Sequence, residues 1–118
     1  MCVRVDIRER QIGELTVVEL TGRLTVTDQP GVLKEAVAAA VARGARNVVL
    51  ELSGVRYIDS TRLGELIAAH ITVTRQGGKL KLVGTPERVC ELLRMAGLDG
   101  VFERFATTED AARSLKTS

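Results

Sequence analysis

Aromatic residues are scarce in this 118-residue chain, at 3% of the sequence, and tryptophan is absent. Hydrophobic residues nevertheless make up 45% and charged residues 27%, which is the ordinary balance of a globular domain. A core of this composition must consist mainly of valine, leucine, isoleucine and alanine. The length fits one domain, which we expect to cover residues 1–118.

Metal-binding and redox-active residues are also few. The chain has one histidine, His70, and two cysteines, Cys2 and Cys90, which form no C-x-x-C pair. A zinc site needs a cluster of such ligands at short spacings, and a secreted disulfide scaffold needs more cysteines. We therefore expect no metal and no cofactor.

The chain lacks a run of one charge and a long apolar run. Acidic and basic residues are interleaved, with a formal net charge of +2, and no aromatics alternate with basic residues. This pattern gives little support for nucleic-acid binding. No signal-peptide pattern or bilayer-spanning stretch occurs. We expect a cytoplasmic protein that binds no nucleic acid and does not insert into a membrane.

Hydrophobic periodicity predicts alternating strands and helices. The expected strands cover residues 3–10, 15–21, 46–52, 79–83 and 101–105. The expected helices cover residues 30–43, 60–76, 86–96 and 108–115. The first two strands form a hairpin, and the alternation that follows requires a partly parallel sheet with right-handed crossovers. The fold class is therefore α/β, with a mixed sheet, an N-terminal hairpin and about four helices.

Each of the first three helices carries an apolar stripe that should be buried against the sheet. The stripes consist of Leu33, Val37 and Val41, of Leu63, Ile67 and Ile71, and of Val89 and Leu93. The other face of the second helix should be exposed, and it carries Arg62, Glu65, Ala69, Thr72 and Gln76.

The most informative stretch is Asp59-Ser60-Thr61, which follows the apolar strand by a short loop and opens the second helix. Short oxygen-bearing side chains at this position can simply cap free backbone N–H groups. Alternatively, Ser60 is a hydroxyl displayed at a surface helix start and modified there. The triplet by itself leaves both interpretations open.

Catalytic arrangements are excluded by spacing. His70 follows Ser60 by ten residues on one predicted helix, so the two lie about 15 Å apart along its axis and cannot share a hydrogen bond. His70 falls on the apolar face, where a packing role is expected. Gly77-Gly78 stands at a helix exit and does not form a phosphate-binding loop. We expect that the protein is not an enzyme.

The chain resembles the STAS domain family, which is shared by sulfate transporters and anti-sigma factor antagonists. Four segments carry the likeness: residues 22–24, residues 48–61, residues 77–83 and residues 92–102. The match is most specific at Asp59-Ser60-Thr61-x-Leu63-Gly64. The resemblance implies a single STAS-like domain that works as a phosphorylation-switched interaction module.

In similar bacterial proteins, a partner that is both serine kinase and anti-sigma factor phosphorylates the Ser or Thr after the Asp. The unmodified form binds that partner and frees the sigma factor, and a serine phosphatase resets the cycle. By position, the acceptor here is Ser60. The implied partner-binding residues are Asp59, Ser60, Thr61, Arg62, Gly64, Glu65 and Thr25.

Two of these residues depart from the family pattern. Arg62 stands where the family usually has a glycine or small residue, and we expect its cation to be exposed near the acceptor. Thr25 stands where an acidic residue is common. We expect a monomer or weak dimer. The alternative is a STAS scaffold subunit of a lipid-transport or stress-signalling complex, docked permanently through an exposed stripe of Ala69 and Thr72.

Overall fold

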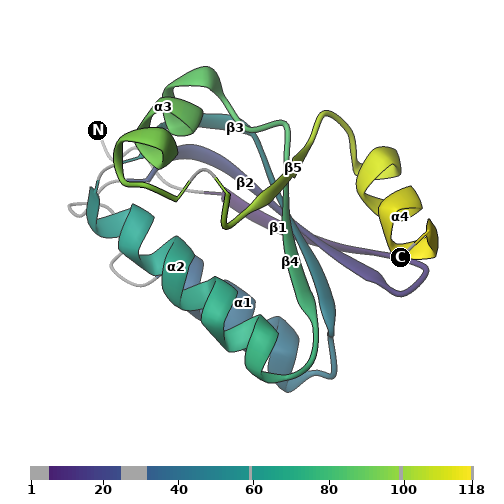
Figure 1. The fold of residues 1–118 in the computed structure, drawn as a ribbon. Coiled ribbons are helices and arrows are strands. Elements are labelled where there is room, and N and C mark those ends of the chain that lie inside the picture. The colour runs from purple at the N-terminus through teal and green to yellow at the C-terminus, as the bar shows by residue number, and fades with distance from the viewer. Residues whose placement is uncertain (1–5, 25–31, 59, 99, 118) are drawn as a thin grey trace.

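Five strands form one sheet whose spatial order follows the chain, β1-β2-β3-β4-β5 (Figure 1). The structure is a computed structural model that describes residues 6–24, 32–58, 60–98 and 100–117. The strands are β1 (Asp6–Ile12), β2 (Leu15–Leu24), β3 (Asn47–Ile58), β4 (Lys79–Val83) and β5 (Glu103–Phe105). The helices are α1 (Val32–Ala42), α2 (Ser60–Arg75), α3 (Glu87–Met95) and α4 (Thr108–Thr117).

The strand directions explain where the helices lie. β1 pairs antiparallel with β2, and every later neighbouring pair is parallel. Right-handed crossovers in a sheet that grows in one direction place all connecting helices on the same face. The connecting helices α1, α2 and α3 accordingly share one apolar cluster with β3, whereas α4 packs on the opposite face (Figure 1). The predicted α/β class, mixed sheet and N-terminal hairpin are confirmed.

β3 is the central strand and is covered on both faces, as its apolar sequence predicts. Val48 and Leu50 point into the cluster beneath α1 and α2, and Val49 points into the smaller cluster beneath α4. All three side chains are fully buried. The strand is longer than predicted, because it continues through Val55 to Ile58 where a short loop was expected. Both of these residues are buried, so the extension belongs to the core.

The predicted stripe of α2 is partly wrong. Its buried residues are Arg62, Leu63, Leu66, Ala69 and Val73. Ile71 is 45% exposed, while Ile67 is half-buried and packs against the core. A stripe drawn in steps of four residues drifts around the helix, by about 80° over two steps at 3.6 residues per turn. The true stripe mixes steps of four and three, and it therefore includes Ala69 instead of Ile71.

The same drift affects α1. Leu33 and Val37 are fully buried as predicted, but Val41 is only half-buried, and Ala40 lies in the core instead. On α3, both predicted residues, Val89 and Leu93, are buried.

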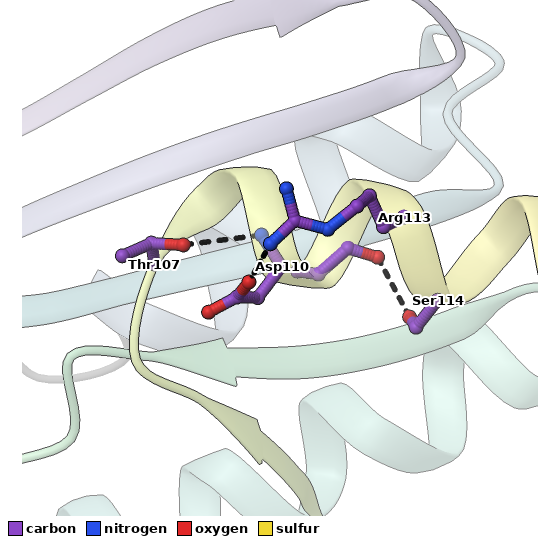
Figure 2. A network of polar contacts seen from close by, with 5 residues as sticks. Thr107, Asp110, Arg113 and Ser114 are labelled. Atoms are coloured by element: carbon purple, nitrogen blue, oxygen red, sulfur yellow. Dashed lines mark hydrogen bonds and ion pairs between the residues drawn. The ribbon is translucent and has the colours of Figure 1, made fainter.

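α4 begins as its sequence predicts. The Thr107 hydroxyl oxygen accepts a hydrogen bond of 3.1 Å from the backbone N–H of Asp110, which is a side-chain N-cap (Figure 2). The Asp110 carboxylate pairs with Arg113 one turn later, and the Ser114 hydroxyl donates to the Ala111 carbonyl. Ala111 is fully buried against the sheet, so the cap fixes the start of the helix that covers the second face.

Candidate functional site

The start of α2 presents the predicted acceptor on the surface. β3 ends at Ile58, which is buried, and α2 begins at Ser60, which is exposed together with Thr61. Asp59 lies outside the described residues. Leu63 and Leu66 are buried, and they hold the first turn of α2 against the sheet. Ser60 is therefore a surface residue at a helix start that is anchored in the core.

Arg62 is not where the sequence predicts it. Only 1% of its side chain is exposed, and its guanidinium forms an ion pair with the Glu65 carboxylate, three residues later on α2. The reason is the rotation of the buried stripe, because position 62 lies one turn before Leu66 on the inner face. The prediction of an exposed cation near the acceptor is wrong.

Glu65 connects α2 to α1. Its side chain is 12% exposed, and its Oε1 atom accepts a hydrogen bond of 3.3 Å from the backbone N–H of Lys34. Lys34 is the third residue of α1, so its N–H is one of the four that have no acceptor within their own helix. No local sequence pattern indicates that a residue of α2 would accept a hydrogen bond from the first turn of α1.

Gly64 is a further predicted residue that lies on the surface at the start of α2. Gly64 is exposed, and a Cβ atom placed on it would meet no heavy atom within 4 Å. Ser60, Thr61 and Gly64 therefore form a small, uncharged exposed area at the start of α2, with the Arg62–Glu65 pair packed behind them. Thr25 lies outside the described residues, and its role stays a prediction.

The single histidine packs away from this area. α2 is continuous from Ser60 to Arg75, so Ser60 and His70 lie about 15 Å apart along its axis, as the sequence predicts. The half-buried His70 ring contacts Phe102 edge-on, with ring centroids 5.2 Å apart. This contact supports a packing role for His70.

A cavity lined by described residues lies at the opposite end of β3 from Ser60. This cavity of about 510 Å³ is lined by residues that include Glu9, Thr16, Arg43 and Asn47. It lies where β3 begins, whereas Ser60 follows the end of that strand. Across the described residues, no three His, Cys, Asp or Glu side chains are grouped to hold a metal ion. In the same part of the chain, no helix is long and apolar enough to cross a membrane.

Comparisons with known proteins agree with this architecture. The family model described as STAS domain matches residues 6–112. The anti-sigma-B factor antagonist of Bacillus subtilis (strain 168) is 31% identical over 109 residues, which are 92% of this chain and 96% of that protein. A crystal structure of an anti-sigma factor antagonist from Mycobacterium paratuberculosis superposes with a TM-score of 0.82 at 22% identity, covering 95% of this chain and 94% of the other. The Bacillus cell fate determinant SpoIIAA, solved in its phosphorylated form, gives a TM-score of 0.72 at 18% identity and covers 93% of this chain and 99% of that one.

Proposed function

Because the chain belongs to the STAS domain family, we propose that it is an anti-sigma factor antagonist whose partner binding is switched by phosphorylation of Ser60. The observation that carries the proposal is the exposure of Ser60 at a helix start that Leu63 and Leu66 anchor in the core. The similarity to the anti-sigma-B factor antagonist of Bacillus subtilis supports the proposed role. The similarity to SpoIIAA, which was solved in its phosphorylated form, supports the proposed switch.

In the proposed cycle, the unmodified domain binds an anti-sigma factor that has serine kinase activity and so releases a sigma factor. The partner transfers phosphate to Ser60 and dissociates, and a serine phosphatase restores the binding form. The domain itself catalyses no reaction and works as a regulatory module. We place this cycle in the cytoplasm, with the domain as a monomer or weak dimer.

The physical effect of the phosphate falls on the interface and not on the fold. Phosphorylation adds about −1.5 to −2 charges at neutral pH. The positive end of the α2 dipole favours an anion by roughly 0.3–1 kcal/mol, and the neighbouring Asp59 carboxylate offsets part of this gain. A partner docked over Ser60 would have to bury that dianion, which is costly without a matching cation. Among the described residues that open α2, Thr61 and Gly64 are exposed with Ser60, whereas Arg62 is buried beside Glu65.

The scaffold alternative loses the feature on which it depended. It required an exposed stripe of Ala69 and Thr72, but Ala69 is 1% exposed. Thr72 is half-buried, and its hydroxyl donates a 3.0 Å hydrogen bond to the Ala68 carbonyl. This side of α2 belongs to the packed interior, so we do not favour a permanent docking face there.

Phosphate mapping tests the proposal. The domain is incubated with ATP and with the anti-sigma kinase purified from its source cell, and the product is analysed by intact-mass and peptide mass spectrometry. We expect one phosphate, on Ser60, and none on Ser60→Ala. Thr61→Val is the matched control and should accept phosphate as the unmodified sequence does. A phosphate on Thr61 would move the site by one residue, whereas failure to bind or accept phosphate from any such kinase would contradict the proposed function.

A further inference from the structure

Two of the contacts of Glu65 join the first turns of two helices. One carboxylate oxygen pairs with Arg62 of its own helix, and the other accepts the backbone N–H of Lys34 in the first turn of α1. We propose that Glu65 is a positioning residue that fixes the first turn of α1 beside the acceptor turn of α2, so that the partner meets both turns as one rigid surface. This inference rests on the proposed function, because it concerns the same partner site.

Burial separates this role from a direct partner contact. The Arg62 side chain is 1% exposed and that of Glu65 is 12% exposed, so neither presents its charge to an incoming protein. The buried guanidinium and the largely buried carboxylate hold each other in place, because moving either one would leave the other charge poorly compensated. Arg62 therefore restricts the Glu65 side chain and directs it toward α1.

The first turn of α1 needs a hydrogen-bond acceptor from outside its own helix. The first backbone N–H groups of any helix lack intrahelical acceptors, and the same end carries partial positive charge. The Glu65 carboxylate provides both an acceptor and a negative charge at this end of α1, from a neighbouring helix that packs alongside (Figure 1).

The contact also brings α1 near the acceptor. Ser60 precedes Glu65 by five residues on α2, which is a rise of about 7.5 Å along the helix. Lys34 and Glu35 in the first turn of α1 are exposed. A protein that covers Ser60 over the area of an ordinary interface therefore also covers this turn.

Two double variants isolate the hydrogen bond from the ion pair. R62M/E65Q removes both charges but keeps an amide oxygen that can accept the Lys34 N–H, whereas R62M/E65L removes the charges and the acceptor. Replacing a buried ion pair by apolar residues of similar volume is often tolerated, so R62M/E65L should fold. R62M/E65Q should also fold, because its amide oxygen can keep the hydrogen bond from the Lys34 N–H. Glu87→Ala serves as the surface control, since the Glu87 side chain is 79% exposed.

The first readout is amide hydrogen exchange of Lys34 in the free domain, which needs no partner. We expect exchange at this amide to be about tenfold faster in R62M/E65L than in R62M/E65Q, because a tenfold change corresponds to the loss of about one hydrogen bond. Glu87→Ala should exchange like the unmodified sequence. Equal Lys34 exchange in the two double variants would overturn the contact itself.

The second readout is the dissociation constant for the anti-sigma kinase. We expect R62M/E65L to bind about tenfold more weakly than R62M/E65Q, although their melting temperatures are similar, because only the position of α1 differs. Equal affinities would overturn the positioning role. If the unmodified domain binds no such kinase, both the proposed function and the positioning role are wrong. The exchange result still decides, independently, whether Glu65 holds the first turn of α1.

Discussion

His70 on α2 contacts Phe102 edge-on, at 5.2 Å between ring centroids and an interplanar angle of 65°. Phe102 is 4% exposed and belongs to the main core cluster. The histidine ring therefore packs from α2 against the edge of this core. This relationship gives His70 a packing partner in the core.

Replacing His70 should therefore leave partner binding intact. We expect His70→Leu to bind the anti-sigma kinase within about twofold of the unmodified sequence, because Leu also fills a half-buried apolar site. Phe102→Ala should instead lower the free energy of unfolding by about 3–5 kcal/mol, the usual cost of truncating a buried aromatic ring. Denaturant unfolding and a binding titration check both. Lost binding in a folded His70→Leu variant would show a role beyond packing.

Arg62 should matter for stability. The sequence alone, with Arg62 placed on the surface, predicts almost no change in melting temperature when it is replaced, since exposed ion pairs contribute about 0–1 kcal/mol. Its burial reverses the expectation: Arg62→Ala leaves Glu65 without its cation and should cost about 3–5 kcal/mol.

The matched control for Arg62 is Arg113→Ala. Arg113 forms an ion pair of the same i,i+3 spacing with Asp110, but its side chain is 70% exposed. We expect a loss of at most about 1 kcal/mol there. Chemical denaturation of both variants provides the comparison, and equal losses would contradict the burial argument.

Two glycines should respond oppositely to alanine. A Cβ atom at Gly78 would lie 1.7 Å from the Arg46 carbonyl oxygen, and the Gly78 N–H already bonds to Val73, so the backbone must shift. A Cβ atom at Gly64 meets nothing within 4 Å, and Gly64 lies inside α2. Gly78→Ala should lower the melting temperature by several degrees. Gly64→Ala should raise stability by up to about 1 kcal/mol, as alanine in an open helix position does.

A charge at position 60 should alter binding without altering the fold. We expect Ser60→Ala to bind the kinase constitutively and Ser60→Asp to bind at least about tenfold more weakly, because the partner must desolvate a carboxylate. Both should melt within a few degrees of the unmodified sequence, since Ser60 is exposed and an anion suits a helix N-terminus. Calorimetric titration and thermal melts measure this. Tight binding by Ser60→Asp would refute the charge switch.

Much of the architecture could be predicted because local patterns and global fold agree. Alternating strands and helices with one hairpin permit few topologies once crossovers are right-handed. The start of the last helix at Thr108 and the apolar strand through Val48, Val49 and Leu50 appear in the structure as the sequence predicts. The exposed position of Ser60 could also be predicted from the sequence, because short polar residues are typical of helix N-termini. Its role in phosphorylation stays a prediction.

The rotation of α2 about its own axis could not be predicted in this way. Its apolar residues are numerous enough to define two overlapping stripes, one through Ile67 and Ile71 and one through Leu66 and Ala69. Which stripe faces the sheet depends on how α2 packs beside α1 and β3. That packing is determined by contacts with side chains that are distant in sequence.

The sequence by itself determined the order of elements, the one-domain α/β class and the place of Ser60 and Thr61 at a helix start, because periodicity and capping are local. Only the tertiary structure decided that Arg62 is buried, that it pairs with Glu65 and that Glu65 reaches Lys34. Lys34 and Glu65 are 31 residues apart, and a hydrogen bond between them exists only after α1 and α2 have packed side by side on the sheet.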